Sequence, residues 1–248
     1  MSPADTGEAE RTLVELRRLR QRTHARAHGG AWLPAAGVAA LLLLSIALYR
    51  YPFEPAYAIT AEYPYWAGLP DQQRSPLASY LFWFLGTPLL IAVIGAWYRW
   101  RSRQLGLRVA WWPFAGTALG VLVLLAILAA VPKGPPSDEL IANTGFWWQG
   151  LLTPLLPIAA ALVALARVER SLGLAVAGVW IALLAVWLCG NPRLGYLPPW
   201  VIQLIDGNPD ALGGELALRP GHYLVLMALP LVIFAAVRAR RSRRYAGE

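Results

Sequence analysis

The chain has 248 residues, of which 57% are hydrophobic and 15% charged, and its formal net charge is +8. A disordered chain has too little apolar surface to offset the entropy of ordering, and a water-soluble domain of this size could not bury so much of it. The composition therefore excludes both classes and is typical of an integral membrane protein.

Residues 1–30 form a basic arm in which Leu13, Leu16 and Leu19 recur near one face, with Arg17 and Arg18 among the arginines around them. This pattern predicts an amphipathic helix. Such a helix either lies on the membrane surface against anionic lipid or docks a cytoplasmic partner.

Six apolar segments follow, and each approaches the ~20 residues that cross a hydrocarbon core of ~30 Å. None of them contains Asp, Glu, Lys or Arg, and they span residues 31–49, 76–98, 109–131, 144–166, 172–190 and 221–237. The sequence therefore predicts an all-α bundle of six transmembrane helices over 31–237, followed by a basic tail, 238–248. Prolines inside these segments predict kinked or broken helices; they are Pro34, Pro88, Pro113, Pro154, Pro157 and Pro230.

The flanking charges predict the orientation, because Lys and Arg near span ends stay on the cytoplasmic side. If the N-terminus is inside, the inner segments 1–30, 99–108, 167–171 and 238–248 hold 17 of the 22 basic residues, and the outer segments hold five. We therefore expect a multi-pass protein of the plasma membrane with both termini in the cytoplasm. The positive charge follows from this topology, so we expect no nucleic-acid partner.

The inner segment 99–108 reads RWRSRQLGLR and holds four arginines in ten residues. These arginines either only hold the segment on the cytoplasmic side of the membrane, or they also dock a partner. In the second case the docking residues are Arg99, Arg101 and Arg103, together with Arg17 and Arg18 of the arm.

A GxxxG pair, Gly116 and Gly120, lies in segment 109–131, and Gly173 with Ala177 forms a similar small-residue pair in 172–190. Small residues four apart let helices approach closely. The pairs predict packing within the chain or, alternatively, a contact in a homo-oligomer.

Groups that carry chemistry are scarce in the sequence. The six segments hold no carboxylate or basic side chain, there is no GxxxxGK[ST] phosphate loop, and Cys189 is the sole cysteine. We therefore expect no enzymatic activity, cofactor or metal site. A minor alternative, lipid chemistry at the outer face, would require His222 or an acid of the loop 191–220.

Three stretches, RLRQRTHARAHGGAWLP, LLTPLLPIAAALVALARVERS and FAAVRARRSRR, resemble those of uncharacterised integral membrane proteins of actinobacteria. More distantly, the chain is similar to the permease half of ABC-2-type exporters. That resemblance implies six spans, an amphipathic helix before the first, a coupling element between the second and third, and outer re-entrant helices between the fifth and sixth. Residues 8–26, 99–108 and 200–205 occupy those places.

The sequence thus predicts a transport-associated, permease-like membrane subunit without its own ATPase site, which would take a cytoplasmic nucleotide-binding subunit as partner. The alternative is a non-transporting anchor or sensor that uses the basic arm inside and the aromatic loop 50–75 outside.

Overall fold

The computed structural model describes residues 14–15, 30–54, 66–105, 112–130, 151–190 and 218–246. These residues form helices and connecting turns, with no strand among them, which confirms the predicted all-α class. The main helices are α2 (Trp32–Ser45), continued by the short helix η1 (Ile46–Leu48), α3 (Pro76–Leu105), α4 (Trp112–Ala130), α6 (Leu155–Glu169), α7 (Leu172–Gly190) and α9 (Pro220–Ala246).

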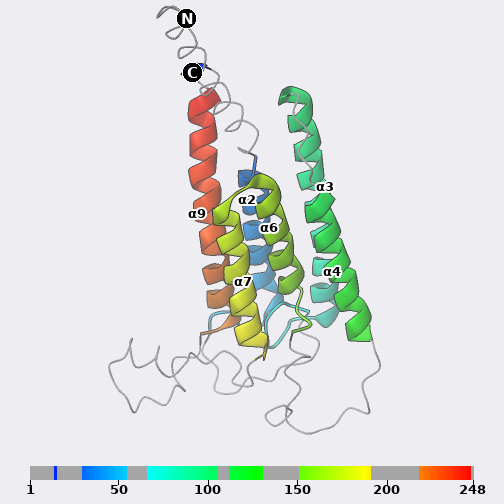
Figure 1. Cartoon of the computed structure of the whole chain (residues 1–248). Coiled ribbons are helices and arrows are strands. Elements are labelled where there is room, and N and C mark those ends of the chain that lie inside the picture. Colours follow the sequence, from blue (N-terminus) through cyan, green and yellow to red (C-terminus); the bar gives the residue numbers. More distant parts are fainter. Residues whose placement is uncertain are drawn as a thin grey trace, which may run out of the picture.

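Helices α2, α6, α7 and α9 form a close-packed bundle, α4 packs on α6, and α3 lies at the outside against α2 (Figure 1). Contacts at the two ends show that α2 and α7 run opposite to α3, α6 and α9. At one end Tyr98 of α3 bonds Glu169 at the end of α6, and Trp97 of α3 bonds Gly30 before the start of α2. At the other end Cys189 of α7 lies by Gly68, and Gly221 at the start of α9 bonds Pro52, which follows α2 and η1. We call the end that holds the C-terminal turns of α3, α6 and α9 the arginine end, and the other the Asp71 end.

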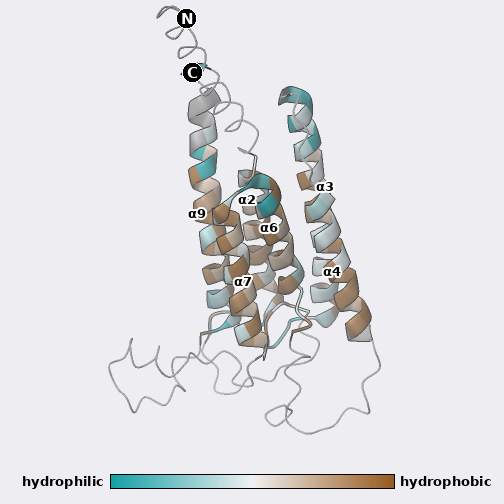
Figure 2. Cartoon of the chain, viewed as in Figure 1, coloured by the Kyte–Doolittle hydropathy of each residue, from teal (hydrophilic) through white to brown (hydrophobic). Residues whose placement is uncertain are grey.

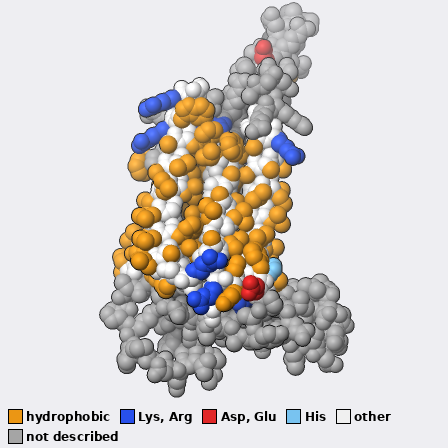
Figure 3. Space-filling view, turned by 180° about the vertical axis from the view of Figure 1, so that it is seen from behind, with side chains coloured by type: hydrophobic (Ala, Val, Ile, Leu, Met, Phe, Trp, Pro, Cys, Tyr) orange, Lys and Arg blue, Asp and Glu red, His pale blue; other side chains and the backbone are white. Residues whose placement is uncertain are grey.

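Three helical segments are long and apolar enough to cross a membrane: Pro76–Gln104, Leu172–Gly190 and Pro220–Arg240, with mean hydropathies of 2.0, 2.4 and 1.9. Their apolar windows are 28%, 39% and 44% buried within the chain, so most of this apolar surface faces outward. Hydrophobic residues cover the sides of the described helices (Figures 2 and 3). An outward apolar surface of this extent is incompatible with water and indicates a membrane-embedded protein. The shorter apolar helices Trp32–Leu48 and Trp112–Leu128 accompany them.

The predicted boundaries agree with the structure at α7 and differ elsewhere. Residues 32–48 are helical where 31–49 was predicted, and the described part of the predicted segment 109–131 is helical over Trp112–Ala130, as α4. Helix α3 continues to Leu105, seven residues past the predicted end at 98. The prediction ended this segment at residue 98 because the arginines begin at residue 99. Arg and Gln are good helix formers, so the helix continues past the end of the apolar segment.

The predicted segment 144–166 does not form one helix. Residues 151–154 are not helical, and α6 begins at Leu155 and reaches Glu169. Residues 144–150 lie outside the described part. Pro154 is the N-cap residue of α6 and Pro157 lies in its first turn, where an N–H has no partner in the helix and its loss costs little.

Four of the six prolines that predicted kinked or broken helices lie at the start of a described helix. Pro34 and Pro113 also lie in first turns, those of α2 and α4. The other two, Pro88 in α3 and Pro230 in α9, lie in helix interiors beyond the first turn. The prediction of a kinked or broken span is therefore wrong for Pro34, which lies in the first turn of α2. It is confirmed at Pro154, where the predicted segment 144–166 is interrupted before α6 begins, and Pro157 lies in the first turn after this break.

Candidate functional site

Glu169 is a buried carboxylate at the arginine end, where it closes α6. It is 2% exposed, and the Tyr98 hydroxyl donates a hydrogen bond of 2.6 Å to its Oε1. The guanidiniums of Arg101 and Arg238 act on it from α3 and α9. This carboxylate therefore connects three helices through opposite charges and one charge-assisted hydrogen bond.

Burial raises the pKa of Glu169, and the Tyr98 hydrogen bond and the two guanidiniums oppose this rise. The turn that follows is tight. Arg170 adopts the left-handed conformation with φ 48°, and the N–H of Ser171 bonds the carbonyl of Ala166 at 2.9 Å. This C-cap turns the chain directly into α7 and holds Glu169 at the packed end of the bundle.

Arg101 faces inward, unlike its neighbours in the arginine-rich segment. It is half-buried, and a Cβ built on Gly30 would lie 2.9 Å from its Nη1. A side chain at residue 30 would therefore require the end of the Arg101 side chain to shift. Because its charge acts on Glu169, Arg101 contributes to the packing of the bundle, and the structure does not bring it together with the exposed Arg99 and Arg103.

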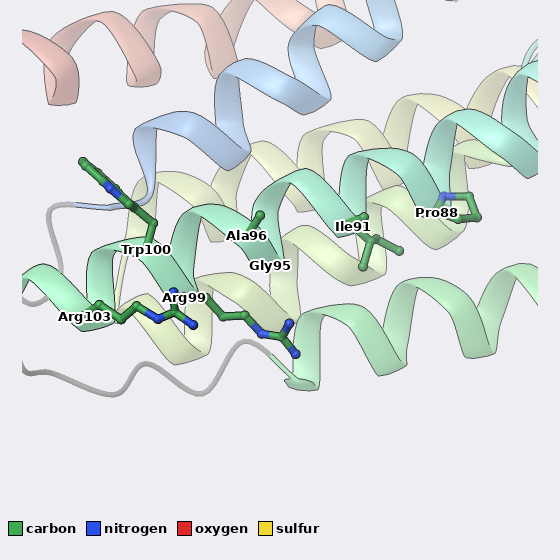
Figure 4. Close-up of a pocket in the computed structure, with 8 residues that line it drawn as sticks. Pro88, Ile91, Gly95, Ala96, Arg99, Trp100 and Arg103 are labelled. Carbon is green, nitrogen blue, oxygen red and sulfur yellow. The ribbon is translucent and has the colours of Figure 1, made fainter.

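Arg99 and Arg103 lie one turn apart on the outer face of α3, and both are exposed. They close one end of a groove with a cavity volume of about 470 Å³. Figure 4 shows Arg99 reaching toward the start of α4. The described residues that line the groove are Pro88, Ile91, Ala92, Gly95, Ala96, Arg99, Trp100 and Arg103. We refer to it as the α3 groove. Small side chains at 92, 95 and 96 leave it hollow.

Three tryptophans gather beside the groove. The rings of Trp32 and Trp97 meet edge to face at 5.5 Å, and those of Trp97 and Trp100 stack at 5.1 Å. The indole N–H of Trp97 donates to the carbonyl of Gly30 at 3.4 Å. Tryptophan prefers the headgroup level of a bilayer, so this cluster marks the depth at which the groove reaches the membrane surface.

A second polar cluster lies at the Asp71 end. Asp71 and Arg219 form an ion pair of 3.5 Å between Oδ2 and Nη2, with both side chains nearly fully buried. The Tyr49 hydroxyl accepts the N–H of Leu69 at 2.7 Å, and Arg74 Nε donates to the carbonyl of Tyr49 at 2.8 Å. These bonds fasten the segment after residue 66 to the ends of α2 and α9.

Burial raises the pKa of Asp71, whereas the backbone N–H of Gln72 and the charge of Arg219 act to lower it. Nε and Nη1 of Arg219 have no hydrogen-bond partner among the described residues. A buried ion pair with unsatisfied donors contributes little net stability, but removing one partner leaves the other charge stranded. The pair therefore makes this end sensitive to substitution.

Gly68 and His222 complete the Asp71 end. Gly68 has φ +115°, and its carbonyl accepts the Thr153 hydroxyl. His222 Nδ1 accepts the N–H of Arg219 at 3.3 Å, and its ring meets that of Phe53 at 5.2 Å. In this place His222 caps the start of α9. The enzymatic alternative named His222 or an acid of the loop 191–220, and the acids of that loop lie outside the described residues.

The glycines of α4 face away from the bundle, whereas two glycines of α7 contact neighbouring helices. Gly116 and Gly120 are exposed, and a Cβ on either would meet no described atom within 4 Å. The described part of the chain therefore does not pack on this pair, and both packing within the chain and the homo-oligomer contact stay predictions. Gly173 does pack within the chain, because its Cβ would lie 2.8 Å from Phe234. Gly178, which sequence reasoning missed, also packs against a neighbouring helix, with its Cβ position 3.0 Å from the carbonyl oxygen of Ala159.

The predicted docking residues of the arm, Arg17 and Arg18, lie outside the described part of the chain. Sequence reasoning also missed Glu169 and Asp71, which it counted as loop charges. The sequence did contain a signal for both residues, because each is an acid within a few residues of a long apolar segment. An acid in such a place can be buried by the packed helices and paired with a cation.

No clustering of three or more His, Cys, Asp or Glu that could hold a metal ion occurs among the described residues. Comparison of the chain with protein-family models, with curated proteins and with solved structures finds no match.

Proposed function

We propose that the chain is a six-span subunit of the plasma membrane with its arginine end in the cytoplasm, and that it is a transport-associated, permease-like protein. In this account a cytoplasmic nucleotide-binding subunit docks on the last turn of α3, which we call the α3 tip: Arg103 and Gln104, both exposed. The chain itself supplies no ATPase site.

The observation that carries the proposal is the length of α3. Its 30 residues extend over ~45 Å at ~1.5 Å per residue, whereas the hydrocarbon core is ~30 Å thick. Since α3 starts with apolar residues at Pro76 and ends in arginines, the excess length lies at the arginine end. A rigid helix that projects from the membrane offers a surface to a soluble partner.

The charge distribution supports the orientation. The arginine end gathers Arg99, Arg103, Arg167 and Arg240 among its exposed side chains. Lys and Arg are retained in the cytoplasm, so this end lies inside. The predicted arm, 1–30, and the tail, 238–248, would then face the same partner. The similarity to ABC-2-type permeases, which rests on the order of these elements, agrees with the proposal.

The packing of the bundle supports the alternative, a non-transporting anchor or sensor. The interior of α2, α6, α7 and α9 is filled by fully buried apolar side chains such as Leu42, Leu162 and Ile181. In the described residues the α3 groove lies outside this core. A close-packed core holds these helices in place and leaves no path between them in the described part of the chain.

Affinity purification from cells that express the tagged chain distinguishes these two functions. The test variant is Arg103→Glu with Gln104→Glu at the α3 tip, and the matched control is Arg50→Glu, an exposed arginine at the Asp71 end. Both variants must first reach the membrane at wild-type levels. The proposal predicts that an ATPase co-purifies with the wild type and the control but not with the test variant. Recovery of no ATPase, or recovery that is equal from both variants, refutes docking at the α3 tip.

A further inference from the structure

The α3 groove has the shape and charge of a lipid site. Its floor is apolar, formed by Ile91 and the small residues at 92, 95 and 96, and its end carries the guanidiniums of Arg99 and Arg103. None of the eight described lining residues is acidic. A ligand that fits this arrangement has an apolar chain and a negatively charged head.

The depth of the groove matches one leaflet. From Arg99 to Pro88 the helix rises by ~16 Å at ~1.5 Å per residue, about half of the ~30 Å hydrocarbon core. The tryptophan cluster of Trp32, Trp97 and Trp100 lies at the level of Arg99, which puts the arginines among the headgroups. The apolar part of the groove then runs inward to the middle of the bilayer.

Two arginines suit a headgroup with a net negative charge better than a zwitterionic one. The guanidinium donates two parallel N–H groups to phosphate oxygens, and the positive choline group of a zwitterionic lipid would meet the same cations. Arg99 and Arg103 lie one turn apart, so both can face one headgroup.

We propose that the α3 groove binds one anionic phospholipid of the cytoplasmic leaflet, with an acyl chain along Ile91, Ala92 and Ala96 and the phosphate on Arg99 and Arg103. The site shares Arg103 with the α3 tip and otherwise lies below it, within the membrane. Lipid binding does not depend on whether a nucleotide-binding partner exists.

Native mass spectrometry of the full chain in a neutral detergent tests the proposal. The protein is titrated with phosphatidylglycerol, with phosphatidylcholine, and with glycerol phosphate as the free headgroup. The charge variant is Arg99→Gln with Arg103→Gln. Its matched control, Arg167→Gln with Arg240→Gln, removes two exposed arginines from the same end of the bundle.

The proposal predicts preferential binding of phosphatidylglycerol by the wild type and the control. Since each arginine near an anionic lipid contributes about 1 kcal/mol, the charge variant should bind it roughly 30-fold more weakly. Equal affinity for the two phospholipids, an equal loss in the control, or displacement of phosphatidylglycerol by glycerol phosphate would overturn it.

A second variant tests the groove by shape, without changing charge. Ala92 lines the groove and is exposed, so Ala92→Phe fills the acyl channel without disturbing the bundle. Ala236→Phe, at an exposed position of α9, is the control. Ala92→Phe should weaken phosphatidylglycerol binding about tenfold, the loss of roughly 1.4 kcal/mol of apolar contact. Unchanged binding would refute the groove as the site, and this result holds even if the arginine variant fails to fold.

Discussion

Gly178 is the position at which the packing of α6 against α7 can be tested most sharply. A Cβ added there would lie 2.9 Å from Val163 Cγ2, 3.0 Å from the carbonyl oxygen of Ala159 and 3.2 Å from Leu162 Cβ. The Val163 methyl can rotate away, but the carbonyl of α6 belongs to the helix backbone and cannot. Gly178→Ala must therefore push the two helices apart.

The cost of this change follows from two opposing effects. Overpacking a tight contact costs roughly 1–3 kcal/mol, and alanine in place of glycine returns about 1 kcal/mol of helix propensity. Gly116→Ala in α4 receives the same propensity gain with no steric cost, since a Cβ at Gly116 meets no described atom. Because the propensity gain cancels, the two variants should differ in unfolding free energy by about 1–3 kcal/mol.

Unfolding in mixed micelles of neutral detergent and dodecyl sulfate, followed by circular dichroism, measures both variants under the same conditions. We expect Gly178→Ala to unfold at a lower sulfate fraction than the wild type or close to it, and Gly116→Ala to unfold at a higher one. Equal midpoints for the two variants would refute the close contact between α6 and α7.

Three further predictions concern the two buried clusters. Burial raises the pKa of Glu169 above the ordinary value of 4.5, so its contribution to stability is complete below that value and declines as the pH rises through the folded-state pKa. From pH 4 to pH 7 the difference in unfolding midpoint between Glu169→Gln and the wild type should therefore shift in favour of the variant. A difference that stays constant with pH would contradict this. Arg219→Leu leaves Asp71 buried without its cation and should cost about 3–5 kcal/mol, while the double variant with Asp71→Leu should recover much of it; a simple sum of the single effects would disprove the pairing. Gly68→Ala places a side chain at φ +115° and should destabilise by roughly 1–3 kcal/mol in the same assay, whereas a neutral effect would argue against this turn.

The sequence predicted the helical class and the place of most helices because both depend on long apolar segments. Segment 172–190 matches α7 because an apolar run bounded by Ser171 and Asn191 changes character abruptly at both ends. Hydropathy could not place the start of α6, since Leu151 and Leu152 are as apolar as the helix that follows them. Proline was the better guide there, because its ring fixes where a helix can start.

The candidate site was predicted only in part, because charge counting treats all arginines alike. Arg101 differs from Arg99 and Arg103 only in its position around α3, which turns it toward Glu169. Helical periodicity shows that positions 99 and 103 share a face that 101 does not, but which face is buried depends on α2 and α6, far away in the sequence. The same holds for Asp71 and Arg219, which are separated by 148 positions and meet only in the folded chain.

Accessibility labelling tests the orientation on which the account rests. In a Cys189→Ala background, which removes the sole cysteine, Gln104→Cys marks the α3 tip and Arg50→Cys marks the Asp71 end; both positions are exposed. Cells that express each variant are treated with a membrane-impermeant maleimide before and after permeabilisation. The account predicts that Arg50→Cys reacts in intact cells and that Gln104→Cys reacts only after permeabilisation. Reaction of Gln104→Cys in intact cells would contradict a cytoplasmic arginine end, and with it the docking of a cytoplasmic partner on α3.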